Sequence, residues 1–409
     1  MAECLLSKGI YIEITPFFPT PDSFRGPFIY DQVKAIIDTD RFDRVVVFRP
    51  CNVNNVVKDY VYDGIEVHYF PVKILPANFF VSLFDKWNIK SFLTKLNEVG
   101  IDIQSIKVAH SHVSRNGIYA NALKEINNKI ITILQHHDLD PYNIIISKKS
   151  DYKINLRFNS KKNIALFNKI DLHVGVSKNV IDNLRSFPSY GKNEIYKPYL
   201  KALSKVQCIE SPQLKRTYVL YNGVNTDIFH EKHVYRDEVF TIGCIGNFLE
   251  LKSQITLIKA VEEIIKRNKT ERIKAVFIGT GPCYNDCVNY VHDHILNDYI
   301  LFKKEVKHEE LVDFYNSIDL FVLPSIFDGF GCVFTEAYAC GVPFMACYGQ
   351  AVSELLPEED WDKWLIRPTD YIDLANKILL YKENRYKQEL NQPYDIKFLI
   401  DKFLNELNL

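Results

Sequence analysis

Short, almost uninterrupted apolar stretches alternate with amphipathic stretches along most of this chain, and this alternation constrains its fold more than any other feature. A first series of apolar stretches begins at Arg44, Ile65, Lys107, Ile130 and Leu172, and a second at Tyr218, Phe240, Lys274, Asp319 and Pro343. Apolar strands that alternate with helices are typical of parallel sheets covered on both faces. The sequence therefore predicts an α/β protein with two Rossmann-like, doubly wound parallel-sheet domains that face each other across a cleft.

The polar, aperiodic segment 222–238 separates the two series and gives the best domain boundary. We predict an N-terminal domain over residues 1–222 and a C-terminal domain over residues 223–393. The last segment, 394–409, has apolar residues at helical spacing on one stripe; they are Ile396, Leu399, Ile400, Phe403, Leu404 and Leu407. We expect this segment to be a helix that packs back on the N-terminal domain.

The composition indicates a globular protein and excludes some functions. Of 409 residues, 47% are hydrophobic and 25% charged, with a net charge of -1, so the overall charge gives no argument for nucleic-acid binding. No apolar run approaches the roughly 20 residues of a membrane span, and the first residues lack a secretory signal. We expect a cytoplasmic protein in which the nine cysteines are reduced thiols.

Candidate binding residues follow the predicted strands, because ligands of open parallel sheets bind where strand ends meet helix N-termini. Gly246 and Asn247 follow one strand of the second series, and Lys252 precedes an amphipathic helix. Helix amides and a lysine suit a phosphate group, although a solvated lysine fits the same pattern. Gly279 and Gly281 follow the next strand without the third glycine of a nicotinamide-cofactor fingerprint, so we interpret them as turn residues.

The segment PSIFDGFGCVFTEAYACGVP, residues 324–343, carries the strongest signal. A strand ends, a loop with Asp328 and two glycines follows, and a helix is expected to start within 332–335, with Glu336 on its exposed first turn or so. The glycines let the backbone approach a ligand, and Glu336 could accept hydrogen bonds from hydroxyl groups. A simple connection, in which Asp328 caps the helix and Glu336 complements its dipole, explains the same residues.

This segment resembles the signature of the retaining GT-B glycosyltransferases of family 4, the glycosyl transferases group 1, in which two acids eight positions apart flank a Gly-Phe-Gly loop. The resemblance continues in order and spacing from about Tyr218 to Leu356, through YNGVNTDIF, CIGNFLELKSQITLIKAV and GVPFMACYGQAVSELL. It is looser in the N-terminal half, where PFFPTPDSFRGPFIYDQVKAI looks like the family's first glycine loop and IITILQHHD like a later strand end.

The resemblance implies a role for each matching residue. Glu336 would bind the ribose hydroxyls of a nucleotide sugar, while Asp328 and the amides of Gly329, Phe330 and Gly331 would hold the sugar ring.

The remaining matches concern the diphosphate, the base and the reacting carbon. Lys252, with Asn247 nearby, would neutralise the diphosphate, and Gly26 would let the N-terminal loop approach it. Val306 would contact the base, and His137 would face the sugar near the reacting carbon. In such enzymes no metal and no other cofactor is needed.

The chain departs from the family at two of these positions. Asp328 stands where the family usually has Glu, and Asn247 where it often has Arg, so neutralisation of the diphosphate would rest more on Lys252. We interpret both changes as tuning of donor choice, and loss of activity is the alternative. The resemblance implies a retaining transfer in which the leaving phosphate helps to take the acceptor proton and Asp328 only positions the ring.

Four histidines near two predicted strand ends raise the question of a metal site. His110 and His112 share one face of a strand, and His136 and His137 end the next. No carboxylate or cysteine completes a ligand set at a recognisable spacing, so we predict no metal site.

A basic segment, residues 147–169, carries seven lysines or arginines and one aspartate, a local excess of six positive charges. Interleaved apolar residues would suit contact with an anionic membrane, and a solvated lysine-rich face explains the segment equally well. We hypothesise that it holds the enzyme at the inner membrane face.

The predicted function is transfer of a hexose from a nucleotide-diphosphate donor, with UDP favoured and GDP as an alternative, to a glycan or lipid-linked glycan in surface polysaccharide or glycoconjugate synthesis. Two alternatives stay open: a nucleotide-sugar epimerase or phosphorylase of the same architecture, and a non-catalytic protein that binds a glycan or a partner.

Overall fold

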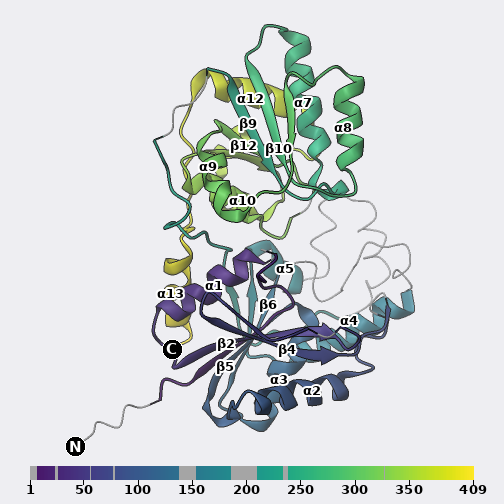
Figure 1. Ribbon diagram of the computed structural model, residues 1–409, viewed down its shortest axis with the longest axis vertical. Coiled ribbons are helices and arrows are strands. Elements are labelled where there is room, and N and C mark those ends of the chain that lie inside the picture. Colours follow the sequence, from purple (N-terminus) through teal and green to yellow (C-terminus); the bar gives the residue numbers. More distant parts are fainter. Residues whose placement is uncertain are drawn as a thin grey trace, which may run out of the picture. The chain divides into compact units, whose positions relative to one another are not determined.

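The chain divides into two compact units (Figure 1). The computed structural model describes residues 7–23, 26–55, 57–76, 79–137, 153–185, 210–233, 238–326 and 328–409. The first unit comprises residues 1–221 together with 397–409, and the second comprises residues 222–396. The sequence had placed this boundary between residues 222 and 223.

The first unit contains an eight-stranded sheet, within the described residues, in the order β3-β4-β2-β1-β5-β6-β7-β8 (Figure 1). Neighbouring strands are parallel, except for the antiparallel pair of β3 and β4 at one edge. The strands are β1 (Ile10–Ile14), β2 (Arg44–Asn52), β3 (Tyr60–Tyr62), β4 (Ile65–Val72), β5 (Ile106–His112), β6 (Ile131–His136), β7 (Leu172–Gly175) and β8 (Thr217–Val219). The helices are α1 (Pro27–Asp38), α2 (Asp85–Glu98), α3 (Gly117–Ile126), α4 (Lys153–Phe167), α5 (Lys178–Arg185) and α13 (Ile396–Glu406).

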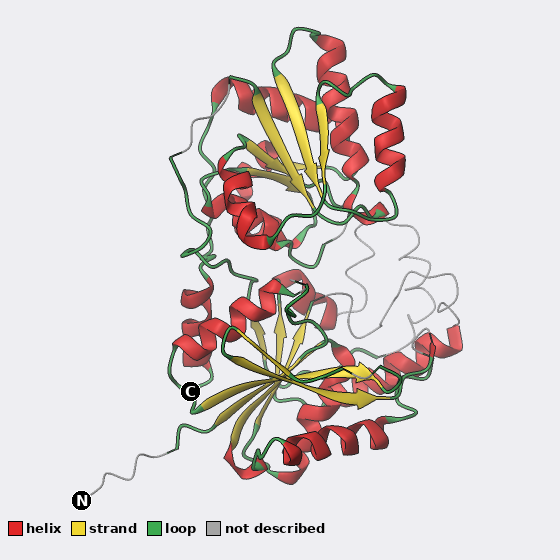
Figure 2. Ribbon diagram, in the orientation of Figure 1, coloured by secondary structure: helices red, strands yellow, loops and turns green. Residues whose placement is uncertain are grey.

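The two faces of this sheet carry separate cores, as the helices on both sides in Figure 2 suggest. Ile12 and Ile14 of β1 belong to the larger core, to which α2, α3, α4 and α5 contribute. Val47 of β2 belongs to the smaller core under α1. Side chains alternate along a strand, so Glu13 lies on the opposite face from Ile12 and Ile14.

The C-terminal helix α13 belongs, apart from its first residue, to the first unit. All six residues of its predicted apolar stripe are buried, which confirms the helical spacing read from the sequence. Phe403 packs beside His110 and Tyr218, with ring centroids 6.3 and 5.2 Å apart respectively.

Two segments of the second unit lie side by side where the chain enters and leaves it. The amide of Val224 donates to the carbonyl of Tyr394 (2.8 Å), and the amide of Ile396 donates to the carbonyl of Val224 (3.0 Å). A side chain on Gly223 would lie 2.7 Å from the Cα of Ile396, so only glycine permits this approach.

Within its described residues, the second unit contains a six-stranded sheet in the order β11-β10-β9-β12-β13-β14, and the neighbouring strands are parallel. Its strands are β9 (Phe240–Ile245), β10 (Ile273–Ile278), β11 (Ile300–Lys303), β12 (Leu320–Val322), β13 (Phe344–Cys347) and β14 (Leu365–Ile366). Its helices are α7 (Gln254–Arg267), α8 (Tyr284–Asp293), α9 (Leu311–Asn316), α10 (Cys332–Ala339), α11 (Trp361–Trp364) and α12 (Tyr371–Asn384).

The structure corrects five details of the predicted strands. β1, β3, β11 and β14 were not predicted, and the stretch at Tyr218, counted with the second series, forms β8 at the edge of the first sheet. Both sheets are otherwise the parallel α/β sheets that the sequence predicts. None of the helices in the described part of the chain has the length and apolar character needed to span a membrane.

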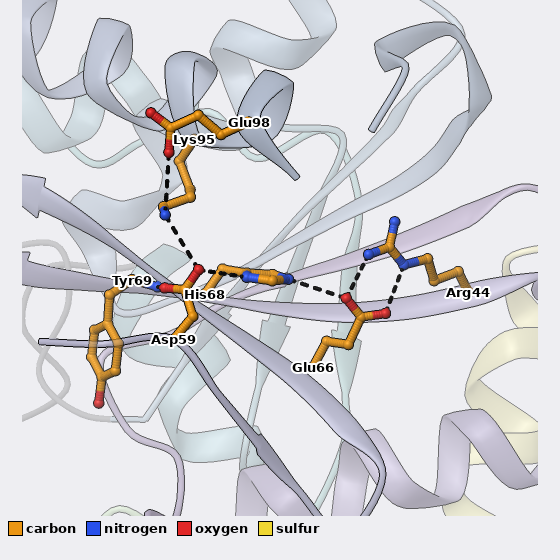
Figure 3. Close-up of polar contacts among 7 residues, drawn as sticks. All are labelled: Arg44, Asp59, Glu66, His68, Tyr69, Lys95 and Glu98. Carbon is orange, nitrogen blue, oxygen red and sulfur yellow. Dashed lines mark hydrogen bonds and ion pairs between the residues drawn. The ribbon is translucent and has the colours of Figure 1, made fainter. Parts of the chain in front are cut away.

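A network of polar contacts ties β4 to β2 and to α2 (Figure 3). Arg44 donates two hydrogen bonds to Glu66 (2.9 and 2.5 Å), and His68 lies between Glu66 (3.2 Å) and Asp59 (2.9 Å). Lys95 donates to Asp59 (3.2 Å). Burial would raise the pKa of Asp59, but hydrogen bonds from His68, the amide of Tyr69 and Lys95 lower it on balance. The ionised carboxylate is therefore the form that stabilises this edge.

We expect Asp59→Asn to lower the free energy of unfolding by about 1 kcal/mol at pH 7, the upper range for partly exposed ion pairs. Because the folded-state pKa of Asp59 is lowered, its contribution is present above the unfolded-state pKa and is lost as the pH falls through the folded-state value. Urea unfolding at pH 7 and at pH 3 measures both effects. The exposed Asp22→Asn is the control, and an equal loss at both pH values would contradict the assignment.

Candidate functional site

The strand order of the second sheet reverses between β9 and β12. β10 and β11 lie on one side of β9, whereas β12, β13 and β14 lie on the other. In open parallel sheets, ligands bind at such a reversal, outside the carboxyl ends of the strands.

Lys252 and Asp328 meet at this reversal point. Lys252 ends a short 3-10 turn (Glu250–Lys252) before α7, and Asp328 lies in the loop after β12. The Nζ atom of Lys252 contacts the Oδ2 atom of Asp328, and the two side chains are 22% and 13% exposed. The amide of Ile326 also donates to the carbonyl of Leu251 (2.7 Å), so the backbones of the two loops are tied together. The structure thus pairs a cation with a carboxylate at the predicted site.

The glycine loop after Asp328 leads directly into α10. Gly331 precedes the helix with φ of 78°, and a Cβ atom there would lie 2.9 Å from the ring of Phe334. The helix begins at Cys332, as the sequence predicts. Phe330 is 2% exposed, so its side chain packs in the interior and only its backbone could contact a ligand.

Close backbone contacts also shape the loop after β9. Asn247 is held by its carbonyl, which accepts a hydrogen bond from the side chain of Gln254 (3.0 Å). A Cβ atom on Gly279 would lie 2.3 Å from the carbonyl oxygen of Gly246, and one on Gly281 would lie 2.6 Å from that of Phe248. The two glycines therefore let the loops after β9 and β10 lie against each other.

The structure corrects the expected setting of Glu336. This residue lies in the second turn of α10 and is 5% exposed, so it is not on an exposed first turn. Its two carboxylate oxygens face His308 Nε2 (3.1 Å) and the hydroxyl of Tyr315, which donates to it (2.8 Å). Burial and the neighbouring carboxylate raise the pKa of Tyr315 well above its usual value, so the hydroxyl keeps its proton. Glu336 is held rigidly, and its remaining lone pairs are the part that could accept further hydrogen bonds.

Val306, the predicted base contact, follows β11 at the edge of the sheet and is 37% exposed. The preceding Glu305 accepts a hydrogen bond from Thr280 (2.7 Å) at the end of β10. Val306 is therefore an accessible apolar side chain at the carboxyl end of the same sheet.

The first unit carries the other two predicted residues, Gly26 and His137. Gly26 precedes α1 with φ of 86°, and a Cβ atom there would lie 2.9 Å from the backbone of Phe17. His137 follows β6, and its ring lies 5.2 Å from that of Phe28 in the first turn of α1. The first turn of α1 thus lies close to His137.

A buried group of polar residues continues from His137 into the sheet. A hydrogen bond of 2.8 Å joins Nε2 of His137 to Nδ1 of His112, and His112 also contacts the carboxylate of Glu13. Burial lowers the pKa values of His110 and His112 to about 3 and raises that of Glu13 to about 7. Sequence reasoning missed Glu13, because the strand that carries it was not predicted and it is remote in sequence from the histidines.

Residues 225–395, nearly all of the second unit, match the family Glycosyl transferases group 1. Two curated relatives are 29% identical to this chain. One is an uncharacterised glycosyltransferase of Methanocaldococcus jannaschii, aligned over 40% of this chain and 43% of its own length. The other, from Mycobacterium tuberculosis, is a GDP-mannose-dependent alpha-(1-6)-phosphatidylinositol monomannoside mannosyltransferase, aligned over 30% of this chain and 36% of its own length. The chain therefore spans less than half of the length of these relatives.

The fold is similar to that of Anabaena HepE, solved in complex with UDP and glucose. The TM-score is 0.62 at 15% sequence identity, over 97% of this chain and 99% of HepE. Residues 225–395 are therefore similar to the Glycosyl transferases group 1 family, and the chain has the GT-B fold.

Proposed function

We propose that this protein is a retaining glycosyltransferase of family 4 that transfers a hexose from a nucleotide-diphosphate donor to a glycan or a lipid-linked glycan. The observation that carries the proposal is the pairing of Lys252 with Asp328 at the strand-order reversal of the domain that matches the family. A cation beside a carboxylate suits a donor that has an anionic diphosphate and a sugar with hydroxyl groups.

Donor binding would exchange the partners of this pair. Lys252 would turn from Asp328 to the diphosphate, assisted by Asn247. Asp328 would then accept hydrogen bonds from hydroxyl groups of the sugar, and the amides of Gly329 and Gly331 would donate hydrogen bonds to it. The ammonium group then stabilises the charge that develops on the leaving diphosphate, and in this proposal no metal is needed there. Glu336 would bind the ribose, and Val306 would contact the base.

The reaction we propose occurs on one face of the sugar. The leaving phosphate takes the acceptor proton and Asp328 positions the ring, while the roles of His137 and Gly26 of the first unit stay predictions from the resemblance. Burial and the neighbouring His112 and His136 keep the pKa of His137 well below its usual value, so this imidazole is neutral and can donate or accept a hydrogen bond.

Both UDP and GDP stay candidates for the donor nucleotide. HepE is solved with UDP and glucose, whereas the mycobacterial relative is dependent on GDP-mannose. We favour UDP.

We also propose a cytoplasmic protein that contacts the inner membrane face through its basic segment. The seven cysteines among the described residues are free thiols, as expected in a reducing compartment. Residues 147–152 lie outside the described residues, and 153–167 form α4, in which Leu156 and Leu166 are buried. Contact with lipid would therefore fall to exposed residues such as Lys161, Lys162 and Ile154.

We expect Lys252→Gln to weaken nucleoside-diphosphate binding by about 10- to 100-fold, because it removes a charge-assisted hydrogen bond. Asp328→Asn should leave binding unchanged or tighten it by up to about tenfold, since it removes the group that competes for Lys252, while sugar transfer falls. Calorimetry with UDP and GDP measures both effects. Lys266→Gln is the matched control, because Lys266 also pairs with a carboxylate, that of Glu262 (2.7 Å). If Lys266→Gln weakened binding as much as Lys252→Gln did, the site assignment would be wrong.

We expect Glu336→Gln to weaken nucleoside binding by about tenfold, because a charged acceptor of the ribose hydroxyls is lost. Glu262→Gln is a close control: Glu262 likewise accepts from a tyrosine, Tyr290 (2.7 Å), and contacts a histidine, His294 (2.7 Å). Thermal shift with and without nucleotide separates lost binding from lost stability. Unchanged nucleotide affinity in Glu336→Gln would remove this residue from the site.

We expect the double variant Lys161→Gln, Lys162→Gln to bind anionic liposomes about tenfold or more weakly, at about 1 kcal/mol for each lysine near the surface. Flotation with anionic and with neutral liposomes measures the loss. The exposed pair on α2, changed as Lys86→Gln and Lys90→Gln, is the control. Failure of the unchanged protein to float with anionic liposomes at low salt would contradict the membrane contact.

The alternative functions predict other products. A transferase releases nucleoside diphosphate faster when an acceptor is added, an epimerase converts the donor sugar without acceptor, and a phosphorylase requires phosphate. A binding protein would show no nucleotide-dependent thermal shift at all.

A further inference from the structure

Glu13, His110 and His112 form a compact group inside the first sheet. Glu13 lies on β1 and pairs in register with His110 on the neighbouring β5, and His112 follows on the same face of β5. All three side chains are fully buried. One ligand-type atom from each, a carboxylate oxygen and two imidazole nitrogens, lie within 4.8 Å of one another.

Four polar atoms of this group lack hydrogen-bond partners among the described residues. They are both carboxylate oxygens of Glu13, Nε2 of His110 and Nε2 of His112. The carboxylate contacts His112 and lies 3.5 Å from Nδ1 of His110, without the geometry of a hydrogen bond to either. Ionisation of a carboxyl group between two neutral imidazoles is costly in a protein interior, because no cation among the described residues is recorded beside it.

The other nitrogen of each imidazole is hydrogen-bonded. Nδ1 of His110 is joined to the hydroxyl of Tyr11 (2.7 Å), and Nδ1 of His112 to Nε2 of His137 (2.8 Å). Histidines that bind a metal through one nitrogen almost always donate a hydrogen bond from the other. A proton on each Nδ1 leaves the lone pair of each Nε2 free, and those are the two unpartnered nitrogens.

We propose that Glu13, His110 and His112 bind a divalent transition-metal cation, with Zn²⁺ as the ion to test first. Two imidazole nitrogens and one carboxylate oxygen are a ligand set that suits Zn²⁺ and its neighbours in the first transition series. The positive charge of the cation would balance the carboxylate. The cation would be bound by unpartnered atoms of the three side chains and would thereby join β1 to β5. The site lies in the first unit.

Metal binding would also fix the tautomer of His137. With Nε2 of His112 on the cation, the proton of His112 sits on Nδ1 and is donated to Nε2 of His137. The neutral His137 then carries its own proton on Nδ1. Any effect of the His137 tautomer on sugar transfer rests on the proposed function, whereas the metal site itself does not.

The test is metal content and metal binding of the full-length protein, with no need for an activity assay. We expect about one equivalent of metal per chain by mass spectrometry after purification without added metal. After treatment with a chelator, added Zn²⁺ should raise the melting temperature. Co²⁺ should give the visible absorption of a cation bound by nitrogen and oxygen.

We expect Glu13→Gln and His112→Gln to lose the metal and to weaken Zn²⁺ binding at least about a hundredfold, beyond the loss usual for a residue that only supports a ligand. Without metal, Glu13→Gln should be at least as stable as the unchanged protein, because the substitution removes the buried carboxyl group that can ionise. This comparison distinguishes a loss of metal binding from a failure to fold. His173→Gln is the control: it alters a buried histidine, hydrogen-bonded to His136 (2.9 Å), outside the ligand set, and should keep the metal. The proposal would be overturned if the unchanged protein were purified without metal and added Zn²⁺ did not change its melting temperature. It would also be overturned if Glu13→Gln bound Zn²⁺ as tightly as the unchanged protein.

Discussion

The parallel pairing of β9 with β12 is the constraint on which the polar site of the second unit depends. Ile242 and Gly243 of β9 lie opposite Leu320 and Phe321 of β12, although the chain forms β10 and β11 between them. A Cβ atom on Gly243 would lie 2.4 Å from the end of the Ile318 side chain, so glycine leaves room for that side chain beside β9. Once the two strands are paired, the turn that ends in Lys252 and the loop of Asp328 leave the same edge of the sheet. Residues 76 positions apart in sequence then share one contact.

Much of this arrangement could be predicted from the sequence, because it depends on local pattern and on spacing. The apolar strands, the boundary near residue 222, the stripe of α13 and the start of α10 at Cys332 follow from periodicity, composition and the glycine loop. The proximity of Lys252 and Asp328 follows from the rule that the carboxyl ends of parallel strands share an edge. These features need no knowledge of which side chains meet in the interior.

The features that the sequence did not predict depend on partners from remote strands. A glutamate at position 13 interrupts the apolar run IYIEI, so the first strand was not recognised, and its partners His110 and His112 lie on β5. Glu336 was expected to be exposed because it follows a polar loop, and its burial depends on Tyr315 and His308, which come from another helix and a preceding turn. The burial of a charged residue is a property of the assembled sheet and helices, so periodicity along the chain does not reveal it.

The return of the chain to the first unit at residue 397 makes the second unit an insertion in the first. The paired backbones at Val224 and Tyr394 bring the two ends of that insertion together. During synthesis, the N-terminal sheet therefore lacks its last helix until the whole second unit has been translated. That translation takes on the order of ten seconds or more at ordinary elongation rates. The surface around Tyr218 and His110 that Phe403 later covers is uncovered for that time.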